Sequence, residues 1–166
     1  NRQIFHSFPA NMENLIHLAQ DWAEEMAAAC QTARESIFIS AISLQPPRQA
    51  NTTPFCRLWD SWTNAAARGA QVTFFLPTPS VVHPATARNA ISAAVAFDAG
   101  MKTRFVPPPN LMHAKSVIID RRQVWIGSGN MTAAAAHFNH EIYISFNSEQ
   151  IAAQIINRWQ AISNPA

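Results

Sequence analysis

The stretch His113–Asn130, HAKSVIIDRRQVWIGSGN, decides the expected fold of this chain. Its first part alternates from Leu111 onward and ends in the run 116–119, which is typical of a strand buried on at least one face. The polar residues 120–123 indicate a turn, and the chain returns over 123–126 as a second short strand. We therefore predict a β-hairpin over 111–126 that leads into a glycine-rich loop.

Several polar side chains fall where this hairpin would bring them together. Residues i and i+2 of a strand share a face, so His113 and Lys115 are expected to point the same way, side by side. Glycines on either side of Ser128 allow close backbone approach, and Asn130 or Thr132 is expected to cap a short helix over 133–136. An imidazole, a fixed cation, and hydroxyl and amide donors are the groups that phosphoryl transfer without a metal requires.

The spacing resembles the signature of the phospholipase D superfamily, which is His-x-Lys, four residues, Asp, six residues and Gly-Ser-x-Asn. Every defined position is present within His113–Asn130, and Asn139-His140-Glu141 resembles the Asn-x-Glu that follows the signature in many members. One copy of the signature in a short chain is similar to the small bacterial Nuc-like endonucleases, which work as homodimers. A less specific similarity runs through 35–44, 69–75 and 99–101 and covers most of the chain.

The resemblance implies a mechanism. His113 of one subunit would attack phosphorus and form a covalent phosphohistidine, and His113 of the other subunit would protonate the leaving oxygen. Lys115 and Asn130, helped by Ser128, would hold the non-bridging phosphate oxygens. Neither a metal ion nor another cofactor is implied, because the lysines take the place of a cation clamp. One active site would be shared across a homodimer that forms through the active-site face.

Four other positions are expected to support this site. Asp120 lies in the expected turn and is interpreted as a brace that pairs with backbone amides or an arginine, and Gly127 is interpreted as structural support. Glu141 is interpreted as the carboxylate that accepts from Nδ1–H of His113, with a solvated strand end as the alternative. Ser43 aligns loosely with a polar strand-end residue of the small endonucleases and is a candidate for substrate binding.

At 166 residues the chain is expected to form one domain, 1–166. Beside the hairpin, periodicity predicts helices over 11–33, 55–68, 85–99 and 148–162, and strands over 36–44, 71–76, 103–106 and 141–146. Strands that alternate with helices indicate an α/β fold, with a mixed sheet of about six to eight strands and helices on both faces, as in the phospholipase D-like fold. The tryptophans at 59, 62, 125 and 159 are expected to lie in the core.

Composition restricts the substrate without identifying it. The net charge of +2 permits an anionic substrate, and the similarity to small endonucleases favours nucleic acid, with DNA ahead of RNA. A phospholipid is the alternative substrate for the same chemistry. A non-catalytic nucleic-acid-binding module is the alternative of another class. Lysine occurs only at 102 and 115, which favours the lysine of the signature as a phosphate ligand, because a compact ammonium suits a phosphate oxygen.

The remaining histidines and cysteines are not expected to form a site. The order His137-x-x-His140-Glu141 differs from the helical zinc signature, so metal binding is disfavoured. Histidines 6, 17 and 83 are expected at the surface or in loops, and cysteines 30 and 56 as buried free thiols. No apolar run approaches a membrane span, and the chain begins without methionine. The compartment therefore stays open between a periplasmic or secreted mature form and the cytoplasm.

Overall fold

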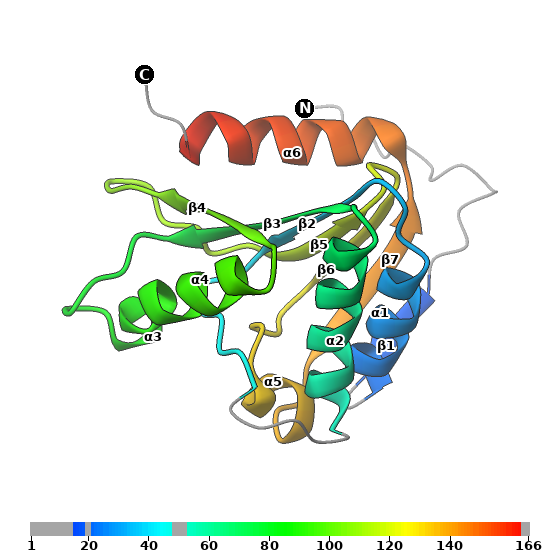
Figure 1. The fold of residues 1–166 in the computed structure, drawn as a ribbon, viewed down its shortest axis with the longest axis horizontal. Helices are drawn as coiled ribbons and strands as arrows, with labels where there is room; N and C mark the ends of the chain where they lie inside the picture. Colours follow the sequence, from blue (N-terminus) through cyan, green and yellow to red (C-terminus); the bar gives the residue numbers. More distant parts are fainter. Residues whose placement is uncertain (1–14, 19–20, 48–52, 164–166) are drawn as a thin grey trace, which may run out of the picture.

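A seven-stranded mixed sheet runs through the centre of the computed structural model, which describes residues 15–18, 21–47 and 53–163 (Figure 1). The strands follow the order β1-β7-β6-β5-β2-β3-β4. Their bounds are β1 Leu15–Leu18, β2 Ser36–Ser40, β3 Gln71–Pro77, β4 Lys102–Val106, β5 Lys115–Ile119, β6 Gln123–Gly127 and β7 Ile142–Asn147. The helices are α1 Asp21–Gln31, α2 Pro54–Ala67, α3 Pro84–Ala87, α4 Asn89–Asp98, α5 Ala133–His137 and α6 Glu149–Ser163.

Parallel and antiparallel pairing meet at β2. The strands β2, β3 and β4 pair in parallel through the crossovers α2 and α3–α4, whereas β5, β6, β7 and β1 extend the sheet in antiparallel pairs. Helices α1 and α2 pack on one face, and α6 packs on the other (Figure 1). The predicted fold class is confirmed, including a mixed sheet with helices on both faces.

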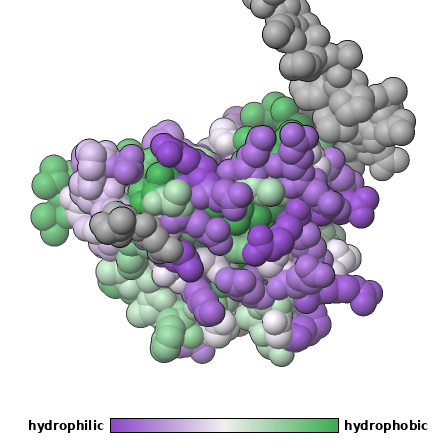
Figure 2. All heavy atoms as spheres, turned by 90° about the horizontal axis from the view of Figure 1, so that it is seen from above, coloured by the Kyte–Doolittle hydropathy of each residue, from purple (hydrophilic) through white to green (hydrophobic). Residues whose placement is uncertain are grey.

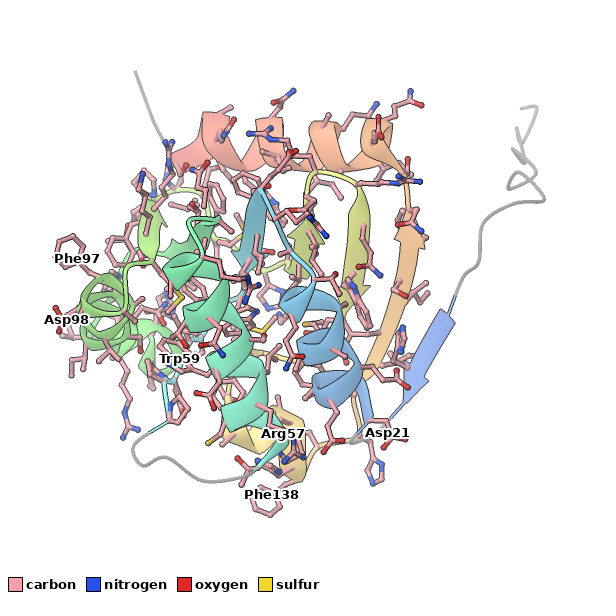
Figure 3. All side chains as sticks on the ribbon, turned by 45° about the vertical axis from the view of Figure 1, so that its right-hand side comes forward. Asp21, Arg57, Trp59, Phe97, Asp98 and Phe138 are labelled. Carbon is pink, nitrogen blue, oxygen red and sulfur yellow. The ribbon has the colours of Figure 1, made fainter. Side chains whose placement is uncertain are left out.

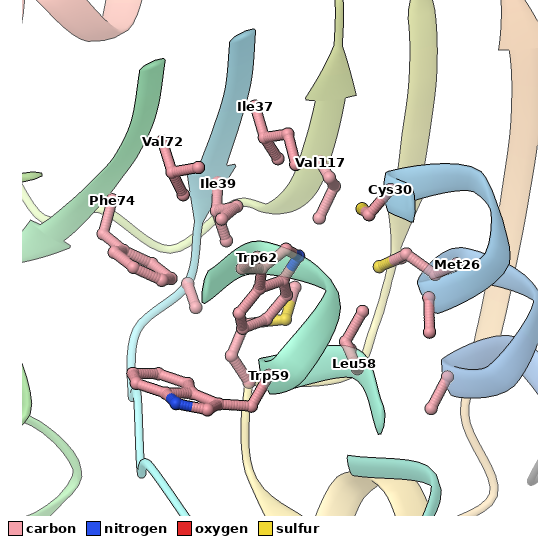
Figure 4. Packing of buried hydrophobic residues seen from close by; sticks show 14 of the residues in the cluster. Met26, Cys30, Ile37, Ile39, Leu58, Trp59, Trp62, Val72, Phe74 and Val117 are labelled. Carbon is pink, nitrogen blue, oxygen red and sulfur yellow. The ribbon is translucent and has the colours of Figure 1, made fainter. Parts of the chain in front are cut away.

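The larger core lies between the sheet and the helices α1 and α2 (Figure 4). Trp22, Met26 and Cys30 recur at helical spacing along α1 and are fully buried. Trp62 of α2 packs edge-on against Phe74 of β3, with ring centroids 5.5 Å apart. The removal of this continuous apolar surface from water is the main force that holds both helices to the sheet.

A smaller core lies beneath α6. Ile156 and Trp159 of α6 are buried against Phe38 and Phe75 of the central strands. The outer surface on this side is mostly hydrophilic (Figure 2). The predicted core positions of four tryptophans are confirmed, because all four are buried: Trp59, Trp62, Trp125 and Trp159.

The N-terminal segment differs from the helix predicted over 11–33. Leu15–Leu18 is the strand β1, paired antiparallel with β7, and α1 begins only at Asp21. Residues 11–14 and 19–20 lie outside the described part of the chain. Helix-like spacing of a few apolar residues does not exclude a short strand, and the backbone partners offered by β7 decide in favour of the strand.

His17 on β1 is buried, so the expectation that it lies at the surface is wrong. Its Nδ1 is hydrogen-bonded to Glu25 of α1, its Nε2 lies 2.9 Å from Ser145 Oγ of β7, and its ring stacks on Trp125. Glu25, His17 and Ser145 have the order of a hydrolase triad, but Ser145 is only 3% exposed. The arrangement therefore ties β1 to α1 and to the sheet.

Other differences concern the ends of elements. The strand predicted from Leu111 begins at Lys115, so His113 lies just before β5. The helix predicted over 85–99 is divided into α3 and α4 at Arg88. The short helix after the glycine-rich loop is capped by Thr132, whose side chain accepts from the N–H of Ala135 at 3.2 Å.

The cysteines and the exposed histidine agree with expectation. Cys30 and Cys56 are buried free thiols, and burial raises the pKa of Cys30 to about 12. His83 is exposed, while His6 lies outside the described residues. No helix in the described ranges has the length and apolar character needed to cross a membrane.

Gly127 generates a prediction about packing, because β6 approaches β7 very closely there. An added Cβ would meet Ile142 O at 2.4 Å and Tyr143 Cγ at 2.5 Å. We expect Gly127→Ala to lower the free energy of unfolding by roughly 3 kcal/mol, since neither the strand backbone nor the buried ring has room to move. Urea unfolding followed by circular dichroism measures this change.

The control for that prediction is Gly69→Ala. Gly69 has a φ of 95° but nothing within 4 Å of an added Cβ, so the loss is limited to backbone strain. That strain is expected to amount to about 1 kcal/mol. Equal losses in the two variants would contradict the steric explanation for Gly127.

Candidate active site

His113 and Lys115 lie side by side at the start of β5. Lys115 Nζ is 3.2 Å from Nδ1 of His113 and donates to the His113 carbonyl oxygen at 2.7 Å. His113 is exposed, and Lys115 is partly buried. An ammonium group only donates, so it donates to Nδ1, and the neutral imidazole then carries its proton on Nε2. The structure thus places an imidazole and a cation together, as the i, i+2 spacing predicts.

The register of the sheet brings the glycine-rich loop to the same end. Lys115 pairs with Gly127 across β5 and β6, and Gly127 pairs with Tyr143 of β7. Because β6 ends at Gly127, the loop that carries Ser128 and Asn130 begins directly opposite Lys115. Tyr143 OH, which is buried on β7, donates to the carbonyl oxygen of Gly129 at 2.5 Å and holds the loop against the sheet.

Asn130 is held through its side-chain oxygen. Its Oδ1 accepts from the N–H groups of Ile42 at 3.2 Å and Ser43 at 3.4 Å, just beyond the end of β2. Its Nδ2 donates to no acceptor among the residues that the structure describes, so this amide group remains available to a bound anion. Ser43 is buried, and its contribution to the site shown here is its backbone N–H rather than its hydroxyl.

Ser128 and Glu141 bind each other. Ser128 Oγ donates to Glu141 Oε2 and accepts from the N–H of Ile142 at 3.2 Å. Asn139 Nδ2 donates to Glu141 Oε1 at 3.0 Å. Both carboxylate oxygens of Glu141 are therefore engaged, and the chain contains no hydrogen bond between Glu141 and His113 in its described ranges. The reason is local, since Nδ1 of His113 faces the ammonium of Lys115.

Electrostatics link Glu141 to Lys115 without a hydrogen bond. Burial lowers the pKa of Lys115 below its ordinary value of 10.5, and the negative charge of Glu141 acts in the opposite direction. Burial, followed by the charge of Glu141, raises the pKa of Tyr143. Glu141 thus supports the charged form of the lysine in a partly desolvated position, where the ammonium interacts more strongly with an anion than it does in water.

Asp120 lies at the opposite end of the hairpin. Its carboxylate accepts from the backbone N–H groups of Arg34, Glu35 and Ser36 at 3.0, 2.9 and 3.0 Å. Burial acts to raise the pKa of Asp120, but these donors outweigh it, so the pKa lies below its ordinary value of 3.8. These contacts fix the turn between β5 and β6 to the start of β2, which is the kind of contact expected of a brace.

His137 and His140 do not belong to a metal-binding cluster in the described part of the chain. In residues 15–18, 21–47 and 53–163, no group of three or more His, Cys, Asp or Glu side chains is placed to hold a metal ion.

A cavity of about 990 Å³ lies beside α5, with largely apolar walls. It is lined by Gln45, Pro46, Pro47, Thr53, Phe55, Cys56, Arg88, Ile91, Ser92, Val95, Ala133 and His137. The cavity therefore adjoins the site through the segment that follows Asn130, while His113 and Lys115 are not part of its lining.

Several large apolar side chains around α3 and α4 and after α5 are exposed. Val81 and Val82 precede α3 and are 96% and 77% exposed, and Ile91 of α4 is 70% exposed. Phe97, at the end of α4, points away from the body of the molecule, as does Phe138 after α5 (Figure 3).

Comparison with known proteins places this geometry in a family. Residues 26–162 match the family described as "Cardiolipin synthase, PLD-like domain". The chain belongs to this phospholipase D-like family. A phospholipase D from Rickettsia bellii (strain RML369-C) is 27% identical over 134 residues, which cover 81% of this chain and 60% of that protein. This chain therefore spans only part of the length of that relative.

Two solved structures share the fold. Nuc from Salmonella typhimurium, a phospholipase D family member, superposes with a TM-score of 0.68 at 22% identity, covering 90% of this chain and 94% of Nuc. NucT from Helicobacter pylori superposes with a TM-score of 0.67 at 16% identity, covering 91% of this chain and 95% of NucT. The similarity extends over nearly the whole of both structures, which agrees with the predicted phospholipase D-like fold.

Lys115 generates a prediction about its pKa. The chain has only two lysines, Lys102 and Lys115, so labelling with ¹³C-lysine gives two side-chain signals. We expect the Lys115 signal, identified by its loss in Lys115→Arg, to titrate at a pH below 10.5, because burial disfavours the ammonium. In Glu141→Gln the titration should move to still lower pH, because the supporting negative charge is gone.

The other lysine is the internal reference for that titration, since it reports general effects of pH on the sample. Glu149→Gln, on the exposed first turn of α6, is the matched control for removal of one carboxylate. A Lys115 signal that titrates at or above 10.5, or that is indifferent to Glu141→Gln, would show that the electrostatic description of the site is wrong.

Proposed function

We propose that the protein is a metal-independent phosphodiesterase, and specifically an endonuclease that hydrolyses DNA. The observation that carries this proposal is the contact of His113 with Lys115 directly opposite the loop of Ser128 and Asn130. It supplies a nucleophile, a cation and an amide donor at a single end of the sheet. Membership of the phospholipase D-like family and the fold shared with Nuc support the same chemistry.

The proposed reaction has two steps. Nε2 of His113 attacks phosphorus in line, a P–N bond forms, and the P–O bond to the leaving group breaks. His113 of a second copy gives its proton to the leaving oxygen, then takes a proton from the water that cleaves the P–N bond. Lys115 and Nδ2 of Asn130 hold the non-bridging oxygens and offset the negative charge that develops there.

The hydrogen bond between Lys115 and His113 suggests how the substrate prepares the nucleophile. Attack through Nε2 needs the ring proton on Nδ1, yet Nδ1 accepts from the ammonium in this structure. A phosphate dianion or diester anion attracts the ammonium more strongly than a neutral nitrogen does. Movement of Lys115 onto the phosphate would therefore free Nδ1 to carry the proton, so that substrate binding itself selects the nucleophilic form of His113.

We further propose that the site is shared by a homodimer. One chain supplies a single signature, and one imidazole is unable to be bonded to phosphorus and to protonate the leaving group at the same time. A two-fold axis near His113 would bring the second imidazole to the opposite side of the phosphorus, where an in-line leaving group lies. Ser128 would act mainly by holding Glu141, whose charge supports Lys115.

DNA is favoured over phospholipid because the signature of this chain resembles that of the small Nuc-like endonucleases, and the chain shares its fold with Nuc. Contacts restricted to phosphate would give little sequence preference. A phospholipid is the second candidate, and two observations favour it. The cavity has largely apolar walls and is lined in part by Ala133 and His137, which follow Asn130 in the chain. The apolar side chains of Val81, Val82 and Ile91 are exposed. RNA and a non-catalytic nucleic-acid-binding role are the remaining alternatives, and the complete signature argues against the latter.

The central prediction is cleavage in the presence of excess EDTA. Wild type should hydrolyse labelled single- or double-stranded DNA and bis(p-nitrophenyl) phosphate, and His113→Ala should be slower by roughly a thousandfold or more, because the nucleophile is lost. His83→Ala removes an exposed histidine remote from the signature and should retain wild-type rates. Cleavage of DNA should weaken steeply with added salt, because phosphate contacts release counterions.

Different outcomes separate the alternatives. Activity that EDTA abolishes and Mg²⁺ restores would exclude the metal-free mechanism. Turnover of bis(p-nitrophenyl) phosphate and of phosphatidylcholine vesicles, without cleavage of DNA, would move the proposal to the phospholipid. DNA binding without turnover of any diester by the wild type would favour the non-catalytic module.

The shared site makes a separate prediction for mixed dimers. Wild-type and His113→Ala chains that carry different affinity tags are expressed together, and the heterodimer is isolated by two purification steps. We expect its rate per dimer to be close to that of the His113→Ala homodimer, because the one shared site lacks one of its two imidazoles. Half of the wild-type rate would show that each chain works alone, and a heterodimer of His83→Ala with wild type controls for the effect of tagging.

A further inference from the structure

We infer that Asn89 is a positioning residue that sets the active-site Asn130 through the backbone of residues 42–44. The inference rests on the proposed function for the role of Asn130, but its structural basis is independent of the substrate. Asn89 belongs to no part of the signature and is the first residue of α4.

Asn89 is completely buried and has every polar atom of its side chain engaged. Its Oδ1 accepts from the N–H of Leu44 at 3.2 Å. Its Nδ2 donates to the carbonyl oxygen of Ile42 at 3.0 Å and to that of Pro77 at 3.4 Å. One side chain therefore bridges both ends of the segment 42–44 and ties it to the end of β3.

The same segment holds Asn130 from its other side. The N–H of Ile42 donates to Asn130 Oδ1, and the N–H of Ser43 does so as well. Ile42 is thus bound through its carbonyl oxygen to Asn89 and through its N–H to Asn130. Residues 42–44 form a bridge between α4 and the active-site loop, and the position of Asn89 determines where the two donors point.

Further contacts stiffen this bridge. Ser92, one turn along α4, donates to the carbonyl oxygen of Leu44 at 2.5 Å. Leu44 forms a parallel β-bridge with Met131, and the N–H of Gln45 donates to the Met131 carbonyl oxygen at 3.0 Å. Asn130 lies next to Met131, so its backbone and its side chain are both positioned by the segment that α4 holds.

The consequence for the reaction follows from the geometry of the amide. With Oδ1 fixed by two backbone donors, the Nδ2 group of Asn130 has one orientation available for a phosphate oxygen. Loss of Asn89 would leave the N–H of Leu44 and the carbonyl oxygen of Ile42 buried without partners, and the segment would shift to satisfy them. Stabilisation of the developing charge depends on donor placement, so the chemical step should suffer more than substrate binding.

The test compares Asn89→Ala and the milder Ser92→Ala with the control Thr86→Val. Thr86 is also buried, lies on α3 and bonds to Ser80 and His83 rather than to 42–44. Rates are measured with bis(p-nitrophenyl) phosphate and normalised to folded protein. Relative to wild type, we expect kcat to fall about tenfold or more for Asn89→Ala, as for other groups that orient catalytic side chains, with KM changed by less than about threefold.

A double variant separates positioning from general destabilisation. If Asn89 acts through Asn130, then Asn89→Ala combined with Asn130→Ala should be no slower than Asn130→Ala alone. Thr86→Val should leave kcat at the wild-type value. An unchanged kcat in Asn89→Ala, or a fall that multiplies with that of Asn130→Ala, would overturn the inference.

Amide hydrogen exchange provides a readout that needs no activity. The N–H groups of Ile42 and Ser43 should exchange faster in Asn89→Ala and Ser92→Ala than in wild type and Thr86→Val. Unchanged exchange in both α4 variants would overturn the inference even if they were slow enzymes. A wild type that hydrolyses no diester, together with accelerated exchange, would refute the proposed function and leave the bridge from Asn89 to Asn130 standing.

Discussion

The pairing of β5 with β6 is the constraint on which the rest of the site depends. It sets Lys115 opposite Gly127 and so brings the loop of Ser128 and Asn130 to the same end of the sheet. A slip of one residue would turn Lys115 to the other face of the sheet, because the side-chain period of a strand is two. Two features prevent such a slip: the clamp of Asp120 on the start of β2 at one end, and the close approach of Gly127 to β7 at the other.

The second requirement is a cation that is charged although it is partly withdrawn from water. Burial at the start of β5 disfavours the ammonium of Lys115, and the carboxylate of Glu141 compensates without forming a direct bond that a phosphate would have to break. Ser128 and Asn139 keep that carboxylate in place. The carboxylate of Glu141 is therefore held in place by hydrogen bonds, while the ammonium of Lys115 that it supports is able to move onto a phosphate in the proposed mechanism.

Much of this was predictable from sequence, for physical reasons that differ between residues. The short spacing of His113 and Lys115 is a local property that predicted their contact, although β5 begins only at Lys115 and His113 precedes the strand. The alternation of strands and helices, the helices on both faces and the buried tryptophans follow from apolar periodicity, whereas the strand order of the sheet was not predicted. The helix predicted over 11–33 failed because the partner of β1 is β7, more than a hundred residues away, and local spacing carries no information about it.

The contacts that sequence reasoning missed are made by the backbone. Asn130 is held by the N–H groups of Ile42 and Ser43, and every residue but proline offers an N–H, so no residue type marks these positions. Glu141 was expected to accept from Nδ1–H of His113, but its partners are Ser128 and Asn139, while the ammonium of Lys115 lies at Nδ1 of His113. Asn139 was visible in the sequence only as part of the Asn-x-Glu pattern, without a role.

Two histidines in this chain show why the number of partners is a poor guide to catalysis. His17 has a carboxylate on one nitrogen and a serine hydroxyl on the other, as the histidine of a hydrolase does, yet it is buried and its serine is 3% exposed. Among the described residues, the ring of His113 has one hydrogen-bond partner, the ammonium of Lys115, and His113 is exposed. A histidine whose hydrogen bonds are all satisfied within the fold has no capacity left for a substrate. Among the described residues, the incomplete set of contacts around His113 and the unused amide of Asn130 agree with the proposal that a substrate and a second subunit complete the site.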